Sequence, residues 1–142
     1  MMNEFTIDDL DHVAIRVKDL EVSASWYEKV LGLTRKTTPE WGAFPIFMMA
    51  HKTGVALFPA TIGDPMLDPT SKNVKIDHFA FHVSVENFAK ARKKYEALQL
   101  DYIFTDHHYF HSIYTKDPDG HTVELTTIVV EPTSFYGDAF YK

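Results

Sequence analysis

The sequence predicts an α+β protein made of two copies of one βαβββ module. Residues 10–14 read Leu-Asp-His-Val-Ala, and residues 76–80 read Ile-Asp-His-Phe-Ala. Each copy is followed by a stretch with helical spacing and then by stretches with strand-like alternation. The segment between the copies contains three prolines and a glycine, which is typical of a linker. We therefore expect one domain with a first module at 8–58, a linker at 59–75, a second module at 76–130 and a C-terminal tail at 131–142.

The first strand is predicted at residues 11–17, because every second residue from Val13 to Val17 is apolar. His12 and Arg16 fall on the opposite face of this strand. A helix follows over 20–31, with Asp19 as its N-cap and Gly32 as its end. The apolar residues at helical spacing are Val22, Trp26 and Val30. Three further strands are expected, at 33–38, 44–50 and 54–58, with a turn at Lys52-Thr53.

The second module repeats this plan. Its first strand alternates around Phe79 and Phe81, and Ser84 can cap a helix over 85–98. The apolar positions of that helix are Phe88, Ala91, Tyr95 and Leu98. Strands are expected at 101–105, 111–116 and 121–129, and the sequence Asp-Pro-Asp-Gly at 117–120 predicts a turn between the last two. The aromatic side chains of the tail are expected to pack on a neighbouring surface or subunit.

Composition excludes several classes of function. The formal charge of −6, without a basic cluster, argues against nucleic-acid binding. The chain has no cysteine, so disulfides and thiolate chemistry are excluded. No apolar run reaches the roughly 20 residues that a membrane span requires, and the N-terminus does not resemble a signal peptide. We expect a cytoplasmic protein whose partner is a small molecule.

The candidate site follows from the strand parity. The face away from the helices carries His12 in the first module, His78 in the second, and Glu124 on the last strand. Polar residues on this face are expected if it is an outer surface exposed to solvent. They are equally expected if it is the inside of a curled sheet that holds a polar ligand. Two imidazoles at equivalent repeat positions together with one carboxylate suit a divalent metal with open coordination positions.

Three segments carry a family resemblance: residues 10–15 (Leu-Asp-His-Val-Ala-Ile), 26–33 (Trp-Tyr-Glu-Lys-Val-Leu-Gly-Leu) and 112–125 (Ser-Ile-Tyr-Thr-Lys-Asp-Pro-Asp-Gly-His-Thr-Val-Glu-Leu). With these segments the chain resembles the vicinal oxygen chelate superfamily. That superfamily includes glyoxalase I, extradiol dioxygenases, and fosfomycin- and bleomycin-resistance proteins. The resemblance covers about residues 8–130.

The resemblance implies paired βαβββ modules that curl into a cup around a metal held by His12, His78 and Glu124. Fe²⁺ and Mn²⁺ suit this set best, with Zn²⁺ and Ni²⁺ as alternatives. Substrates of the superfamily chelate the metal through adjacent oxygens. Members of this length usually form homodimers, with the modules either paired within a chain or exchanged between chains, and the linker allows both.

The resemblance favours extradiol-type dioxygenase chemistry as the first hypothesis. Glyoxalase I uses a glutamate at the end of the first module as a fourth ligand, where this chain has Ala56 or Leu57. Extradiol enzymes have a tyrosine ten residues before the glutamate, and Tyr114 stands there. They also use histidines for proton transfer, and the candidates just upstream are His107, His108 and His111.

Three other functions remain open. A glyoxalase-like isomerase or lyase could use a different base. A fosfomycin-type thiol transferase would need a cationic cluster, whereas the first module offers an apolar wall of Trp41, Phe44, Phe47, Met48 and Met49. A non-catalytic bleomycin-resistance-like protein would have no need for the metal set. For a bound small molecule, the expected contact residues are Arg16, Phe44, Met48 and His82.

Overall fold

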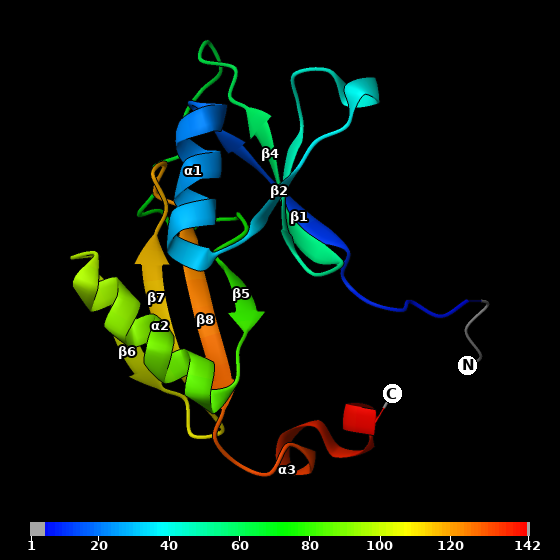
Figure 1. The fold of residues 1–142 in the computed structure, drawn as a ribbon, viewed down its shortest axis with the longest axis vertical. Coiled ribbons are helices and arrows are strands. Elements are labelled where there is room, and N and C mark those ends of the chain that lie inside the picture. The colour runs from blue at the N-terminus through cyan, green and yellow to red at the C-terminus, as the bar shows by residue number, and fades with distance from the viewer. Residues whose placement is uncertain (1–4, 142) are drawn as a thin grey trace. The chain divides into compact units, whose positions relative to one another are not determined.

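The structure is a computed structural model that describes residues 5–141. The chain divides into two compact units, of which the first ends at Pro65 and the second begins at Met66. Each unit is an α+β arrangement with one four-stranded mixed sheet, which confirms the predicted fold class (Figure 1). No helix in the described part of the chain is long and apolar enough to cross a membrane.

The first unit contains one sheet and one long helix. Its elements are β1 (His12–Val17), α1 (Leu20–Leu31), β2 (Thr34–Lys36), the short 3₁₀ helix η1 (Pro39–Trp41), β3 (Ile46–Ala50) and β4 (Thr53–Pro59). The strand order is β1-β4-β3-β2, with β1 parallel to β4 and the other neighbours antiparallel. The predicted alternation of β1 is confirmed, because Ile15 and Val17 are buried and His12 lies on the exposed face.

Helix α1 begins and ends where its sequence predicts. The Asp19 carboxylate accepts a hydrogen bond from the backbone N–H of Val22 at 3.0 Å, and Gly32 ends the helix in the left-handed conformation with φ of 67°. The predicted apolar stripe is partly wrong. Its buried face consists of Ser23, Ala24, Tyr27 and Val30, whereas Val22 is exposed. The small residues at 23 and 24 allow the helix to approach the sheet, and Tyr27 fills the space beside them.

The second unit has the same plan. Its elements are β5 (Phe79–His82), α2 (Val85–Ala97), β6 (Ile103–Asp106), β7 (Phe110–Lys116), β8 (Thr122–Ile128), α3 (Thr133–Tyr136) and the 3₁₀ helix η2 (Gly137–Tyr141). The strand order β5-β8-β7-β6 reproduces that of the first unit, with β5 parallel to β8. Figure 1 shows α2 lying along this sheet.

The helix cap and the turn predicted for the second unit are both present. The hydroxyl of Ser84 accepts the backbone N–H of Asn87 at 3.1 Å and caps α2. Phe88 is buried on the face of α2 that packs on the sheet. Between β7 and β8, the Asp117 carboxylate accepts two backbone N–H groups, and the N–H of Gly120 bonds to the Asp117 carbonyl at 3.0 Å. This turn fixes the register in which β8 returns beside β7.

The C-terminal tail packs on its own unit. The ring of Phe135 lies 4.9 Å from that of Phe110 and 5.4 Å from that of Tyr109, measured between centroids. Tyr136 also contacts Phe110, and Phe140 stacks on Tyr136. The neighbouring surface that the sequence predicted for these aromatic side chains therefore includes the start of β7.

Replacing Tyr95 with phenylalanine should protect the protein at high pH. Tyr95 is 1% exposed, its hydroxyl has no hydrogen-bond partner among the described residues, and burial raises its pKa. A raised pKa means that unfolding becomes easier as the pH rises above the value of about 10 for a free tyrosine. We expect Tyr95→Phe to match the wild type within about 1 kcal/mol at pH 7 and to lose less stability at about pH 10.5.

The measurement is thermal unfolding at both pH values. Tyr141→Phe is the matched control, because Tyr141 is 77% exposed. Equal alkaline losses in wild type and Tyr95→Phe would contradict this account.

Candidate metal centre

The register of the second sheet gathers polar side chains on the face away from α2. Glu124 on β8 lies opposite Tyr114 on β7, and Thr126 lies opposite Ser112. On the other side of β8, Ala80 of β5 pairs with Glu124. His78 comes two residues before Ala80, and because side chains alternate along a strand it points to the same face.

His78 and Glu124 form the nucleus of the site. Nε2 of His78 lies 3.0 Å from Oε1 of Glu124, and the Glu124 side chain is only 9% exposed. On the other side of the ring, Nδ1 of His78 lies 2.8 Å from the carboxylate of Asp77. A carboxylate only accepts, so Nδ1 carries the proton of this bond. The bond also lowers the pKa of Asp77.

The contact between His78 and Glu124 is compatible with either a proton or a metal cation between the two side chains. With one proton on Nδ1, Nε2 of His78 faces Oε1 of Glu124 and can either carry a second proton or act as a metal ligand. Two acceptors that face each other at 3.0 Å are held together only by a proton or a metal cation. Two ligand atoms at about 2.1 Å from one ion and at right angles are about 3.0 Å apart, so the donor pair fits a divalent metal.

A second polar pair borders this nucleus. The hydroxyl of Tyr114 lies 2.8 Å from Nε2 of His107, and the Tyr114 ring stands edge-on to His78 with centroids 5.7 Å apart. Burial raises the pKa of Tyr114, and the nearby Glu124 carboxylate adds to this shift. Tyr114 is therefore a protonated donor at neutral pH, with an imidazole behind it that can take or return a proton.

The first unit carries the matching half of the repeat. Nδ1 of His12 lies 2.8 Å from the carboxylate of Asp11, as Nδ1 of His78 does from that of Asp77. Nε2 of His12 is therefore also the nitrogen available to a ligand. The register pairs Ala14 with Ala56 and Ala56 with Phe47. By comparison with the second unit, Ala56 takes the place of Glu124, and Phe47 takes the place of Tyr114.

The face of the first sheet around His12 is therefore apolar. The ring of Phe47 lies 5.0 Å from that of His12 and 5.5 Å from that of Trp41. Further along the same face, the Arg16 guanidinium lies 5.4 Å from the Phe58 ring centroid and donates to the backbone carbonyl of Pro59 at 3.0 Å. The structure thus places Arg16 on the predicted face.

Phe44 joins the same aromatic group, because its ring lies 6.2 Å from that of Phe58 and it is 44% exposed. Met48, predicted as a substrate contact, does not join this group. Met48 is fully buried, and its register partners Arg35 and Val55 place it on the side of the sheet that α1 covers.

Of the histidines predicted to act at the site, some lie on the face that carries Glu124 and others do not. His107 reaches the site through Tyr114, and His82 lies on the same face, in register with Thr126. His111 does not lie on this face, because alternation along β7 points its side chain to the opposite face. There its ring centroid lies 5.2 Å from that of Phe104.

The remaining histidine of this group, His108, sits in the turn between β6 and β7. Its φ of 71° is left-handed, and its ring packs against Tyr109 at 4.7 Å. The structure therefore does not support the roles predicted for His108 and His111.

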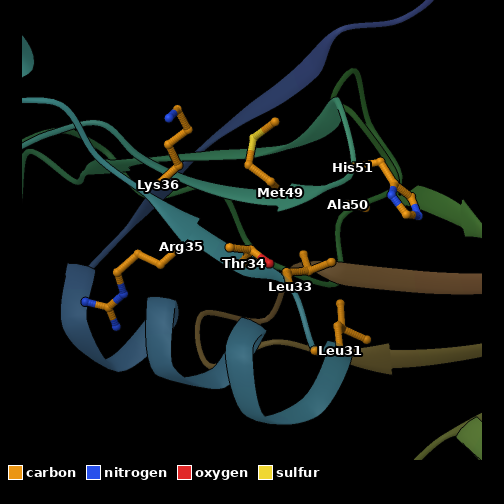
Figure 2. Close-up of a pocket in the computed structure, with 9 residues that line it drawn as sticks. Leu31, Leu33, Thr34, Arg35, Lys36, Met49, Ala50 and His51 are labelled. Carbon is orange, nitrogen blue, oxygen red and sulfur yellow. The ribbon is translucent and has the colours of Figure 1, made fainter.

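A hollow of about 630 Å³ lies at the β2 edge of the first unit, bounded by residues 31–36 and 49–51. Figure 2 shows that its side chains diverge: Arg35 points toward α1, whereas Lys36 and Met49 point away from it. Arg35 is also occupied by ion pairs with Glu21 and Glu28 of α1, at 2.7 Å and 2.8 Å. The hollow offers no converging set of polar groups and is not the candidate site.

The described residues, 5–141, contain no group of three His, Asp or Glu side chains close enough to hold a metal ion. The second unit supplies the pair His78 and Glu124, and the first unit, described by itself, supplies His12. Within the second unit, the donor chemistry of His78 and Glu124 suits a divalent cation: one imidazole nitrogen and one carboxylate.

Two βαβββ units, each with one four-stranded mixed sheet in the same strand order, define the class of this α+β protein. The chain belongs to the Glyoxalase/Bleomycin resistance protein/Dioxygenase superfamily, whose family model matches residues 9–125.

Similar proteins carry names from the same superfamily. "Glyoxylase I 4" of Arabidopsis thaliana is 28% identical over 133 residues, which cover 87% of this chain and 72% of that protein. A glyoxalase/dioxygenase from Nostoc punctiforme superposes with a TM-score of 0.74 at 20% identity, covering 92% of this chain and all of that one. Lactoylglutathione lyase from Agrobacterium tumefaciens gives 0.67 at 19% identity, covering 85% and 94%. At these identities, the two structures show the shared fold alone.

Sequence reasoning did not assign roles to Asp11, Asp77 or Ser112. A signal for the two aspartates was present, since an Asp precedes the repeated histidine in both copies. Alternation along β7 puts Ser112 on the same face as Tyr114, but the contact of Ser112 with Glu124 depends on the register between β7 and β8, which the sequence alone does not specify.

Proposed function

We propose that this protein is a divalent-metal enzyme that acts on a small molecule with two adjacent oxygens, and that extradiol-type oxidation is its reaction. In this proposal His12, from the same chain or from the partner in a homodimer, joins His78 and Glu124 as a metal ligand. The observation that carries the proposal is the contact of 3.0 Å between His78 and Glu124, with both side chains fixed from behind.

The bound ion would supply positive charge to the substrate oxygens and to charge that develops on them. The chain's own residues would orient the substrate and move protons. The Tyr114 hydroxyl, kept protonated by its raised pKa, donates a hydrogen bond to a substrate oxygen beside the ion. His107, at 2.8 Å from Tyr114, accepts or returns the proton that passes through this hydroxyl.

The apolar face of the first unit favours an aromatic substrate. Phe47 and Trp41 lie next to His12, and Phe44 and Phe58 continue this surface toward Arg16. Aromatic side chains of this kind pack well against a planar ring, and a guanidinium at the end of the surface suits a carboxylate substituent on that ring. A catechol with an acidic substituent combines these features.

A second candidate is an isomerase or lyase reaction of the glyoxalase type. The curated relative named "Glyoxylase I 4" favours it. Ala56 argues against the glyoxalase I arrangement, because the register places a methyl group where a fourth, carboxylate ligand would be required.

Anaerobic reconstitution with Fe²⁺ followed by oxygen uptake with a panel of catechols tests the proposal. We expect uptake with at least one catechol and a loss of that uptake of about 100-fold or more in Tyr114→Phe, since general acid–base groups contribute about 10²- to 10⁴-fold. A parallel assay follows the thioester absorbance of lactoylglutathione. Absence of uptake in fully loaded protein, together with turnover of the thioester, would replace the first reaction with the second.

A further inference from the structure

Glu124 is held by a hydroxyl group that the metal-binding set does not include. Oγ of Ser112 lies 2.6 Å from Oε2 of Glu124, and Ser112 is fully buried. The same Oγ lies 2.9 Å from Oγ1 of Thr126. The Ser112 hydroxyl has one proton and the carboxylate can only accept, so this proton goes to Glu124 and Thr126 donates to Ser112.

We propose that Ser112 is a positioning residue for the metal centre: it occupies Oε2 of Glu124 and leaves Oε1 as the one carboxylate oxygen directed at the ion. This inference rests on the function proposed above. Oε1 is the oxygen that lies 3.0 Å from Nε2 of His78. Thr126 supports the arrangement from behind, because its hydrogen bond fixes the orientation of the Ser112 hydroxyl.

The internal repeat supports this role. In the second unit, Thr126 lies two residues after Glu124 on the same strand, β8, and pairs with Ser112 of β7. In the first unit, where Ala56 takes the place of Glu124, Phe58 takes the place of Thr126. The fold therefore does not require a hydroxyl at the position of Thr126, and this hydroxyl occurs in the unit that has the carboxylate.

The physical effect is a choice between coordination modes. A free carboxylate can bind a metal through one oxygen or through both. A charge-assisted hydrogen bond as short as 2.6 Å makes Oε2 a poor ligand, and a buried donor cannot turn to water instead. The carboxylate then occupies one coordination position and leaves one more for the substrate or for oxygen.

The test compares Ser112→Ala, Thr126→Val and Thr127→Val. Thr127 is the matched control: it is the next residue on β8, is 1% exposed, and its hydroxyl has no hydrogen-bond partner among the described residues. Metal affinity is measured with Mn²⁺ by calorimetry, and the coordination mode is read from the visible absorption of bound Co²⁺. Thermal unfolding of the metal-free proteins reports structural damage separately.

We expect Ser112→Ala to bind Mn²⁺ about 10- to 100-fold more weakly, which is the usual effect of removing a group that orients a metal ligand. Its Co²⁺ absorption should fall in intensity, because a carboxylate bound through both oxygens raises the coordination number. Thr126→Val should show a smaller change in the same direction, and Thr127→Val should remain at the wild-type values.

Each other outcome is informative. Wild-type Mn²⁺ affinity and Co²⁺ absorption in Ser112→Ala would overturn the role of Ser112 while leaving the proposed metal centre intact, even where its metal-free form unfolds at a lower temperature. Failure of the wild-type protein to bind either ion would overturn the proposed function and this inference with it. Where Ser112→Ala does not fold, an unchanged Thr126→Val overturns the positioning role.

Discussion

Replacing Glu124 with glutamine is expected to reduce the affinity for divalent metal by at least about 100-fold, the upper end of what removing even a supporting group costs. The substitution keeps the size of the side chain but removes its negative charge. An amide oxygen is a weaker ligand, and the amide nitrogen is not a ligand at all. Oxygen uptake with any substrate should fall with the metal content. Calorimetry with Mn²⁺ and elemental analysis of the purified variant measure the effect.

The control for this variant is Glu86→Gln, which removes the same charge from the second unit. Glu86 lies on α2, where it pairs with Lys90 at 3.1 Å on the surface. It should bind metal as the wild type does, and its stability should change by less than about 1 kcal/mol. A wild-type metal affinity in Glu124→Gln would contradict the assignment of Glu124 as a ligand.

Gly54→Ala is expected to destabilise the first unit by about 3 kcal/mol or more. Gly54 lies on β4, in register with His12 of β1 and Met49 of β3. A Cβ atom at this position would overlap the backbone carbonyl oxygen of Met48, well inside contact distance. Because the overlapping group is backbone in a paired strand, relief requires moving the β3–β4 pair on which the position of His12 depends.

Urea unfolding followed by circular dichroism measures this loss. Gly63→Ala provides the contrast, because no atom lies within 4 Å of a Cβ added there and its backbone is not left-handed. It should be neutral or slightly stabilising, by up to about 1 kcal/mol. Equal unfolding midpoints for the two variants would show that the close approach at Gly54 has no energetic consequence.

The order of helices and strands was predictable from the sequence because each element is signalled locally. Asp19 and Ser84 cap the two long helices, Gly32 ends the first, and the Asp-Pro-Asp-Gly turn at 117–120 precedes the last strand. The internal repeat then supplied the plan of the second unit from that of the first. These signals act over a few residues, so they are readable without the fold.

The sequence alone does not place side chains whose position depends on packing partners. Met48 is an apolar residue of the kind that lines binding sites, but its position in β3 buries it under α1. Its neighbours Phe47 and Met49 point to the other face of the sheet. His111 differs from Ser112 by one position, and that position decides on which face of the sheet it lies. The buried face of α1 includes Ser23 and Ala24 rather than Val22, and hydrophobicity alone does not signal a buried serine.

Strand parity indicates the faces of the candidate residues but not the geometry of a site. Alternation placed His12, His78 and Glu124 on the open faces, and the structure shows the contact between the last two. The hydrogen bonds that orient them, from Asp77 and Ser112, depend on rotamers and on strand register. Residue types alone do not encode either.

The most direct test of the account is the metal content of the wild-type protein after reconstitution with Fe²⁺ or Mn²⁺ and removal of free ion. If the proposed metal centre is correct, the wild-type protein should retain one tightly bound ion for each chain, and both His78→Ala and His12→Ala should lose it. A fully folded wild-type protein that retains no divalent metal would contradict it, because the facing nitrogen and oxygen of His78 and Glu124 would then be bridged by a proton alone.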